Sequence, residues 1–324
     1  MIKKSFRLSN GFWHRFLPNS NKLFSPQNIP LEIWDIEKQI KESKWNPEIY
    51  GIENLTFSNC GDKFVICGGW ITSRPNKSEF KVYDIHTFDC IDEFVIMEKC
   101  SNPAFTKDDK NLIFCTWDGN IYCYSFVEKS LKKQFSIENY VFHSINTGKH
   151  NGVIYISGAQ PRAIKDNWTV YFIFEYLIEE KNGRKLEFTD KRNPNEKVGE
   201  TNLPICGLAL NNNNLAIMTS KYAGKVDGIN VCESKVYIYN TDSKNIKLIK
   251  ENFKINESVF DELGSIVWSK DGKLAFIGLN EIYIVDINNN LEKTIMHNKA
   301  TSLEFSNCGT GIAVGGSKAK LYKI

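Results

Sequence analysis

Short apolar runs separated by polar turns recur along the chain. Two segments share the pentapeptide FSNCG: LTFSNCGDKFVICGG begins at Leu55, and LEFSNCGTGIAVGGS begins at Leu303. The segments AFTKDDKNLIFCTWDG from Ala104 and IVWSKDGKLAFIGLN from Ile266 repeat the pattern with other residues. In each segment a turn rich in Asn, Asp or Gly separates two apolar strands. Because these turn residues tolerate the backbone angles of a tight reversal, each segment predicts a β-hairpin.

Weaker copies of the hairpin surround Phe16, Ile145 and Leu210, so seven hairpins are predicted. A further short alternating strand follows each hairpin and ends in a polar or acidic residue. These seven strands contain, in chain order, Trp34, Tyr83, Tyr124, Phe174, Tyr239, Val285 and Tyr322. The intervals between these positions are 49, 41, 50, 65, 46 and 37 residues. They bracket the roughly 40 to 45 residues of one β-propeller blade, with insertions in the longer repeats.

The repeats resemble those of the WD40-repeat β-propeller family. The turns FSNCG and WSKDG occupy the place of the family's Ser-x-Asp-Gly turn, and TWDGN at 116–120, followed by IYCY, is similar to its entry into the third strand. The position of the family's Trp-Asp dipeptide is held by Trp34-Asp35, Tyr83-Asp84 and Val285-Asp286. The Gly-His dipeptide is absent, so the family's histidine-centred hydrogen-bond network is assigned to no residue. The resemblance implies an all-β fold, a seven-bladed β-propeller with four-stranded antiparallel blades.

The predicted propeller forms a single domain over residues 1–324. Its blades are expected at 11–45, 52–97, 101–137, 142–190, 205–251, 264–297 and 301–324, with 4–9 as the strand that closes the last blade. Closure is expected because an open blade would expose an unpaired sheet edge, although residues 1–10 are also compatible with a loose tail. The polar segment 37–44 is compatible with a helix where the first blade needs a fourth strand. Six or eight blades are therefore alternatives.

Composition and charge limit the possible functions. The chain has 42% hydrophobic, 24% charged and 13% aromatic residues, which is typical of a globular protein and not of a disordered one. Its formal charge of +3 argues against a dedicated nucleic-acid binder. No apolar run is long enough for a membrane-spanning helix, and no secretory signal is apparent. We therefore expect an intracellular, cytoplasmic protein, with a nuclear location left open. The nine cysteines lack any CxxC spacing and are expected to be reduced and buried.

Long connections point to a binding surface. In the resembled fold, the connections between second and third strands and those between blades lie on one face. Unusually long ones are predicted at 68–79, 158–167, 220–234 and 190–204. Insertions on one face of a repeat array often mark its binding surface. The predicted partner-binding residues are Trp70, Arg74, Arg162, Lys165, Trp168, Tyr222 and Lys225, chosen as aromatic and basic contact types. Alternatively, the loops are tolerated insertions and Trp168 is a buried strand residue.

Catalytic and metal-binding motifs are not recognised in the sequence. The five histidines have no ligand spacing, and there is no nucleophile elbow, phosphate-binding loop or dinucleotide motif. Asp35, Asp84 and Asp286 recur at the ends of third strands, where we expect them to accept hydrogen bonds from nearby backbone N–H groups. The Phe-Arg-Arg-Gly motif of phosphoinositide-binding propellers is missing. We predict no catalytic residue, no metal and no cofactor.

Two hypotheses of function follow. The first is a non-catalytic protein-interaction scaffold, a subunit or adaptor that binds one or more proteins through loops on one face. Neither nucleic acid nor a small-molecule substrate is expected as a partner. The second is a propeller enzyme that acts on a small molecule or a glycan in the central channel. Because propellers have many unrelated functions, the fold alone does not decide between them.

Overall fold

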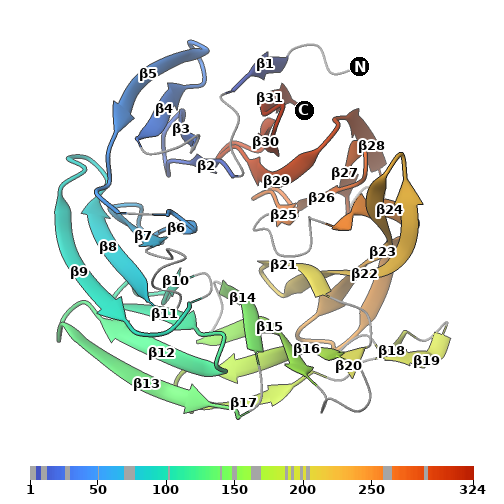
Figure 1. Cartoon of the computed structure of the whole chain (residues 1–324), viewed down its shortest axis with the longest axis horizontal. Coiled ribbons are helices and arrows are strands. Elements are labelled where there is room, and N and C mark those ends of the chain that lie inside the picture. Colours follow the sequence, from blue (N-terminus) through green and yellow to red (C-terminus); the bar gives the residue numbers. More distant parts are fainter. Residues whose placement is uncertain are drawn as a thin grey trace. The chain divides into compact units, whose positions relative to one another are not determined.

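The computed structural model describes most of the chain. The described residues are 5–8, 13–25, 30–49, 51–68, 77–100, 103–138, 141–147, 152–161, 169–186, 189–190, 193–197, 200–201, 205–257, 265–287 and 291–324. The chain divides into two compact units. The terminal unit consists of Met1–Pro47 and Pro204–Ile324, and the middle unit consists of Glu48–Leu203. Each unit is built from antiparallel sheets (Figure 1).

The described residues of the middle unit form two four-stranded sheets, blades 2 and 3, and one sheet of four consecutive strands with a fifth strand added, blade 4. Blade 2 contains β6 (Asn54–Phe57), β7 (Lys63–Gly68), β8 (Ser78–Asp84) and β9 (Cys90–Ile96). Blade 3 contains β10 (Ala104–Phe105), β11 (Asn111–Cys115), β12 (Asn120–Ser125) and β13 (Ser130–Ser136). Blade 4 contains β14 (Val141–Thr147), β15 (Val153–Pro161), β16 (Thr169–Leu177) and β17 (Asn182–Lys185), and β20 (Glu200–Thr201) also pairs with β16. A separate two-stranded ribbon joins β18 (Thr189–Asp190) to β19 (Asn193–Lys197).

The described residues of the terminal unit form four four-stranded sheets, blades 1, 5, 6 and 7. Blade 1 contains β2 (Arg15–Phe16), β3 (Lys22–Ser25), β4 (Leu31–Asp35) and β5 (Ile40–Trp45). Blade 5 contains β21 (Ile205–Asn211), β22 (Asn214–Val226), β23 (Ile229–Asn240) and β24 (Ile246–Asn256). Blade 6 contains β25 (Ile266–Trp268), β26 (Lys273–Ile277), β27 (Glu281–Asp286) and β28 (Leu291–Met296). Blade 7 contains β29 (Ala300–Phe305), β30 (Gly311–Gly316), β31 (Lys320–Lys323) and β1 (Ser5–Arg7).

The predicted fold class is confirmed: the protein is an all-β, seven-bladed propeller. The N-terminal strand completes the last blade, because β1 pairs with β31 in the register Ser5↔Tyr322 (Figure 1). The suggestion of a helix at 37–44 is wrong. Residues 36–39 form a turn, and β5 then pairs with β4 as the fourth strand of blade 1. Its side chains are mostly exposed, which explains why it lacks an apolar signal in the sequence.

The repeated FSNCG turn has a specific structural role. In both copies the serine hydroxyl accepts a hydrogen bond from the backbone N–H that begins the next strand, at Lys63 for Ser58 (3.1 Å) and at Gly311 for Ser306 (2.9 Å). The glycine has a positive φ in each copy, 75° at Gly61 and 69° at Gly309, which favours glycine over other residues. The repeat therefore encodes the turn geometry itself.

An asparagine side chain at this turn also bridges to the next blade. Asn59 donates to the carbonyl oxygen of Thr106 in blade 3 (2.9 Å), and Asn307 donates to that of Leu17 in blade 1 (2.7 Å). The same bridge recurs at Asn211, at the end of β21, which donates to a carbonyl oxygen of blade 6 (3.2 Å). Each bond joins adjacent turns of one unit. Asparagine recurs in these turns because its side-chain amide forms a hydrogen bond to the turn of the next blade.

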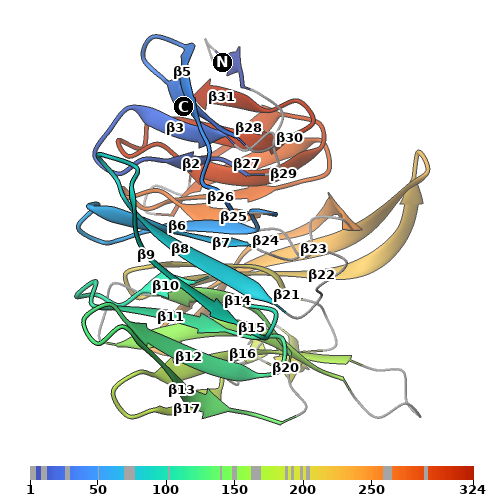
Figure 2. The same cartoon turned by 60° about the vertical axis from the view of Figure 1, so that its left-hand side comes forward.

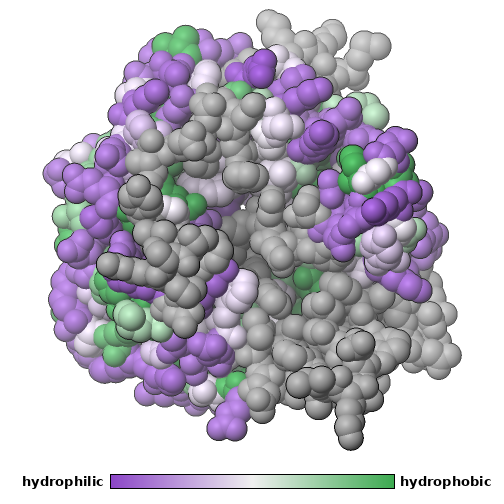
Figure 3. All heavy atoms as spheres, in the orientation of Figure 1, coloured by the Kyte–Doolittle hydropathy of each residue, from purple (hydrophilic) through white to green (hydrophobic). Residues whose placement is uncertain are grey.

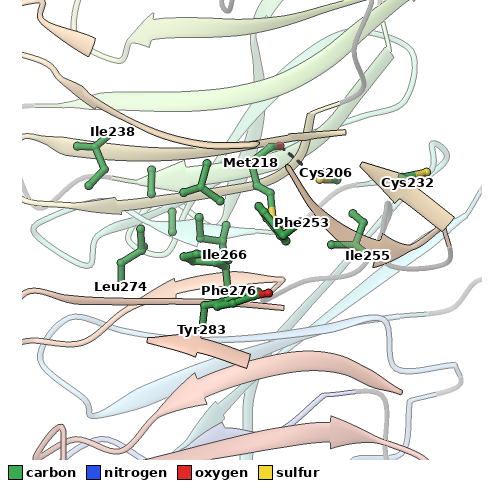
Figure 4. Packing of buried hydrophobic residues seen from close by; sticks show 13 residues of the cluster. Cys206, Met218, Cys232, Ile238, Phe253, Ile255, Ile266, Leu274, Phe276 and Tyr283 are labelled. Atoms are coloured by element: carbon green, nitrogen blue, oxygen red, sulfur yellow. Dashed lines mark hydrogen bonds between the residues drawn. The ribbon is translucent and has the colours of Figure 1, made fainter. Parts of the chain in front are cut away.

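Apolar side chains fill the space between neighbouring blades within each unit. The cluster between blades 5 and 6 is drawn in Figure 4, where Phe253 of β24 and Phe276 of β26 lie with ring centroids 5.3 Å apart. Tyr283 of β27 stacks on Phe276 at 5.2 Å. A second cluster in the terminal unit joins blades 7 and 1 through Leu8, which follows β1, and Leu23 of β3. These contacts bury the inward faces of the strands.

Two buried histidines brace blades of the terminal unit, although the Gly-His dipeptide is absent. His14 precedes β2, and its Nε2 lies 3.1 Å from Ser25 Oγ of β3. His297 precedes β29, and its Nδ1 lies 2.7 Å from the hydroxyl of Tyr322 on β31. Burial lowers the pKa of His297 to about 4, and nearby lysines add to this effect. The sequence did not reveal these pairs because neither histidine follows a glycine.

Candidate interaction surfaces

The structure describes two of the seven predicted partner-binding residues. Trp70, Arg74, Arg162, Lys165 and Trp168 lie outside the described residues, so their roles stay predictions. Tyr222 and Lys225 belong to β22 and are exposed. The predicted loop at 220–234 is not a loop. Its residues continue β22 and β23 as an antiparallel ribbon that contains one bulge in β22, and we call this ribbon the arm (Figure 2).

Local sequence explains why the arm is a ribbon. Val226↔Ile229 is the last pair, so Asp227 and Gly228 form a two-residue turn. Both turn residues have positive φ, 50° and 79°, which is the geometry of a type I′ turn. Asp-Gly is among the sequences that favour this turn most strongly, so the signal was present in the sequence.

A bulge in β22 brings the two predicted contact residues to one face of the arm. Tyr222 pairs with Cys232 and Lys225 pairs with Asn230, with an interruption of the register between Tyr222 and Gly224. Paired residues point to the same side of a sheet, and residues two apart on β23 share a face. Tyr222 and Lys225 therefore lie on the same face. Without the bulge, their spacing of three would place them on opposite faces.

The base of the arm is held by the core of blade 5. The fourth strand, β24, pairs with the arm through Cys232↔Ile255 and neighbouring positions. Cys232 is 1% exposed and Ile255 is fully buried, and both belong to the cluster in Figure 4. Tyr222, in contrast, is 55% exposed. The arm thus presents an exposed aromatic ring and an exposed lysine on a strand whose base is packed.

A second exposed aromatic lies in the middle unit and was not among the predicted site residues. Trp117, in the turn between β11 and β12, is 43% exposed. The Nζ atom of Lys99 lies 3.5 Å from the centroid of its ring, a cation–π contact. Met97, which follows β9, is 73% exposed. In the sequence, Trp117 belongs to the TWDGN turn, which predicts the entry into a third strand.

Hydrogen bonds organise the connection that carries Lys99. Glu98 accepts hydrogen bonds from the hydroxyl of Tyr122 (2.5 Å) and from Nδ2 of Asn120 (2.8 Å). Burial raises the pKa of Glu98, but these hydrogen bonds outweigh burial, and the pKa is lowered overall. The backbone N–H of Trp117 donates to the carbonyl oxygen of Lys99 (3.0 Å). The Trp117 side chain is therefore presented by an ordered connection.

An open depression of about 570 Å³ lies between the turns of blades 2 and 3 in the middle unit. Its charged lining consists of three lysines and three aspartates, Lys63, Lys107, Lys110, Asp62, Asp108 and Asp109. The uncharged lining residues are Asn59, Cys60, Phe126 and Val127. The charges balance. The carboxylate of Asp109 is engaged by the backbone N–H groups of Asn59 and Cys60, both at 2.8 Å. The aspartate therefore serves to join the two turns.

Two of the three acids at the ends of third strands, Asp84 and Asp35, accept hydrogen bonds from nearby backbone N–H groups, as predicted. Asp84 accepts from the backbone N–H groups of His86 (2.8 Å) and Thr87 (2.9 Å), and these bonds lower its pKa. Asp35 accepts from the backbone N–H of Lys38 (2.9 Å), which lowers its pKa in the same way. Among the described residues, no group of three acidic, histidine or cysteine side chains is placed to bind a metal.

The expectation that all cysteines are buried is wrong for Cys60, Cys90 and Cys308, which are exposed, and for Cys123, which is only partly buried. The two FSNCG copies differ in their thiols. Hydrogen bonds from Ser306 and Thr310 lower the pKa of Cys308 to about 7. The carboxylate of Asp62 raises the pKa of Cys60. All nine cysteines are free thiols, as predicted.

The face of the molecule drawn in Figure 3 has no single large apolar patch among its described residues. The described surface there is mainly hydrophilic, with small and separate hydrophobic spots. Within the described residues, no helix has the length and hydropathy needed to cross a membrane. Trp117 and Tyr222 are each exposed, and single side chains of this kind can supply much of the binding free energy of an interface.

Comparisons with known proteins support the fold. No family model matches the sequence, and no curated protein matches it. Among solved structures, the chain is similar to the β-propeller domain of Cps50 (Swd1) from Myceliophteria thermophila. The similarity covers 99% of both chains with a TM-score of 0.65, at 12% sequence identity. At this identity the match establishes a shared propeller fold and leaves function open.

Proposed function

We propose that this protein is an intracellular, non-catalytic interaction scaffold, a subunit or adaptor that binds partner proteins through the arm of blade 5. The observation that carries the proposal is the pair Tyr222 and Lys225. The bulge places both on one face of a projecting ribbon, and the base of that ribbon is packed in the core. Exposed aromatic and basic side chains on a rigid support are the usual anchors of protein interfaces.

The loops of the middle unit provide further support. Trp117 and Met97 are exposed on connections of the middle unit. In the sequence, five predicted contact residues fall between the second and third strands of blades 2 and 4. The WD40-type resemblance and the propeller neighbour are consistent with a scaffold by analogy. No feature of the described residues specifically favours the second hypothesis, an enzyme acting on a small molecule or glycan.

The proposal is tested by capturing the tagged chain from its native cell. The variant Tyr222→Ala with Lys225→Ala should lose bound proteins, because truncating anchor residues typically costs about 2 kcal/mol or more of binding free energy. The matched control is Lys293→Ala with Met296→Ala, which removes a lysine and an exposed apolar side chain from β28 of blade 6. Both variants should unfold at the wild-type temperature. Equal recovery of the same proteins by both variants would rule out the arm as the binding element.

A further inference from the structure

Basic side chains gather at one end of blade 7, in the terminal unit. The strands of this blade lie in the order β1, β31, β30 and β29, and neighbouring strands are antiparallel (Figure 1). Arg7 ends β1, and Lys320 begins β31. Lys318 lies in the turn between β30 and β31, and Lys299 directly precedes β29. These four residues, which we call the basic cluster, therefore lie at the same end of the sheet.

Acidic side chains do not offset the charge of the basic cluster. Residues 5–8 and 299–324 contain five basic side chains and one acidic side chain, Glu304, which forms an ion pair with Arg15 of β2 (3.3 Å). Glu281, in the neighbouring turn of blade 6, accepts a hydrogen bond from the hydroxyl of Tyr283. The sequence on either side of β1, at 1–4 and 9–12, contains no acid. Within the described part of the chain, no member of the cluster forms an ion pair.

Two cations of the cluster lie directly opposite each other in the strand pair that completes blade 7. Arg7↔Lys320 is the last pair in the register of β1 with β31. Directly paired residues share a face of the sheet, with Cβ atoms about 4.5 to 5.5 Å apart, and like charges in such positions destabilise the pairing. Arg7 is exposed and Lys320 is partly exposed, so a ligand can reach both side chains. An anion between them would replace one repulsion by two attractions.

The buried His297 adjoins the basic cluster. Its Nδ1 atom lies 2.7 Å from the hydroxyl of Tyr322, which is two residues from Lys320 on β31 and therefore shares its face. Its Nε2 atom is buried and has no hydrogen-bond partner. Burial lowers the pKa of His297 to about 4, and the charges of Lys320 and Lys318 contribute to this shift. The histidine is thus neutral at pH 7, and the positive charge at this end of the blade belongs to the cluster.

We propose that the basic cluster of blade 7 binds a phosphate group. A phosphate group carries up to about two negative charges near pH 7 and has three acceptor oxygens, so it can satisfy several cations at once. The guanidinium of Arg7 can bind two of these oxygens, and the lysines act as point charges. A single carboxylate has one charge and neutralises the cluster less completely. The site is separate from the arm, so this inference does not depend on the proposed function.

Phosphate binding should strengthen the attachment of β1 to blade 7. This strand has three residues, and among the described strands it pairs with β31. Just beyond the Arg7↔Lys320 pair, the N–H of Leu8 donates to the carbonyl oxygen of Ala319 (3.0 Å). Removing the repulsion next to this hydrogen bond should make it open less often. We therefore expect phosphate to slow amide exchange at Leu8 and to leave β28 of blade 6 unchanged.

The experiment measures the unfolding temperature of the full chain during titration with sodium phosphate, against sodium chloride at equal ionic strength. The cluster variant is Arg7→Gln with Lys320→Gln. The matched control, Lys293→Gln with Lys323→Gln, removes two exposed lysines of the terminal unit outside the cluster, one of them at the other end of β31. Phosphate also stabilises proteins by exclusion from their surface, so the result is the difference between the two variants.

We expect the wild type and the control to show the same saturable rise in unfolding temperature with phosphate. The cluster variant should bind phosphate about tenfold more weakly or worse, because it loses charge-assisted hydrogen bonds. In chloride it should unfold at the wild-type temperature or above, because its neutral side chains do not repel each other, so a lost response cannot come from misfolding. An equal response of the cluster variant and the control would overturn phosphate binding at this cluster.

A second measurement distinguishes a soluble phosphate from a lipid headgroup. The same three proteins are sedimented with vesicles of phosphatidylcholine that contain phosphatidic acid. Retention of the wild type and the control, but not of the cluster variant, would show that the cluster binds the phosphate group of a lipid. A response to inorganic phosphate without retention on vesicles would restrict the site to soluble phosphates. The absence of a cluster-dependent response in both measurements would overturn the proposal.

Discussion

Blades 5 and 6 share one apolar cluster but differ in what their second and third strands do beyond it. In blade 6, β26 and β27 are joined by a short turn in which the N–H of Gly278 donates to the carbonyl of Glu281 (2.7 Å). In blade 5, β22 and β23 continue into the arm. Packing therefore fixes the strands within the cluster, while the exposed part of the arm is not needed for that packing. The difference separates residues that stabilise the fold from residues available for binding.

The largest expected effect is in the shared cluster. Phe276→Ala should lower the free energy of unfolding by about 3 to 5 kcal/mol, because its fully buried ring contacts both Phe253 and Tyr283. Urea denaturation of the full chain measures the change. A loss below about 1 kcal/mol would show that the two blades do not depend on this cluster.

Acid sensitivity should arise from the blade body and not from the arm. The pKa of His297 is near 4 in the folded chain against 6.5 for an unperturbed histidine, so the unfolded state binds the proton more readily between these values. Its stabilising contribution is complete above pH 6.5 and is lost as the pH falls toward 4, by at most about 3 kcal/mol. His297→Gln should flatten the stability profile over this range, and His86→Asn, at an exposed site, should not. An unchanged dependence of stability on pH in His297→Gln would contradict the lowered pKa of His297 as its cause.

Two glycines of blade 5 are needed for different reasons: Gly207 leaves no room for a Cβ atom, and Gly228 has a positive φ. A Cβ at Gly207 of β21 would lie 2.5 Å from Ser265 Oγ and 2.7 Å from Ile266 Cγ2 of the neighbouring segment. Gly207→Ala should therefore cost about 1 to 3 kcal/mol of global stability.

At Gly228, the tip of the arm, no atom lies within 4 Å of a Cβ. Gly228→Ala should cost about 1 kcal/mol of local strain, seen as faster amide exchange confined to the arm. A global loss from the second variant would show that the arm and blade unfold together.

The asparagine bridge between the turns should have a smaller effect. Asn211→Ala removes the hydrogen bond to the carbonyl of Ser269 and should cost about 1 kcal/mol, measured by thermal unfolding. The control is Asn213→Ala, which removes only a hydrogen bond to Asp242 between two exposed turns of blade 5. Equal effects of the two variants would mean that the bridge adds nothing beyond a surface contact.

The smallest effect on stability is expected in the arm. Tyr222→Ala should change the free energy of unfolding by less than about 0.5 kcal/mol, because an exposed side chain makes few contacts that folding needs. The same variant should weaken partner binding. Chemical denaturation and binding measured on one preparation test both statements. A large loss of stability would mean that Tyr222 packs as part of the fold.

The seven blades could be predicted from the sequence because each repeat encodes a local turn. The serine of FSNCG organises the turn, and its glycine supplies the positive φ, so similar sequence produces similar geometry in blades 2 and 7. Third strands were equally recognisable by their alternation. The fourth strand of blade 1 was not, because β5 is exposed and carries no apolar pattern.

The site was less predictable than the fold. The sequence predicts Tyr222 and Lys225 to lie in a loop. They share a face because of a bulge in β22, which is seen only in the strand register. The Asp227-Gly228 turn could have identified the ribbon from sequence. His14 and His297 pair with Ser25 and Tyr322 on other strands of their own blades, and no short sequence motif links each histidine to its partner. Exposure of Trp117 likewise depends on packing that spacing does not encode.

We propose that the arm of blade 5, and not the exposed end of β28 in blade 6, contacts partner proteins. Photo-cross-linking in the native cell tests it most directly, with a benzophenone amino acid placed either at Tyr222 or at Met296. Both positions are exposed, at 55% and 70%, so both probes are accessible. If the arm is the binding element, discrete cross-linked products form from position 222 and none form from position 296. The same products from both positions, or none from position 222 in a chain that still co-purifies with its proteins, would contradict it.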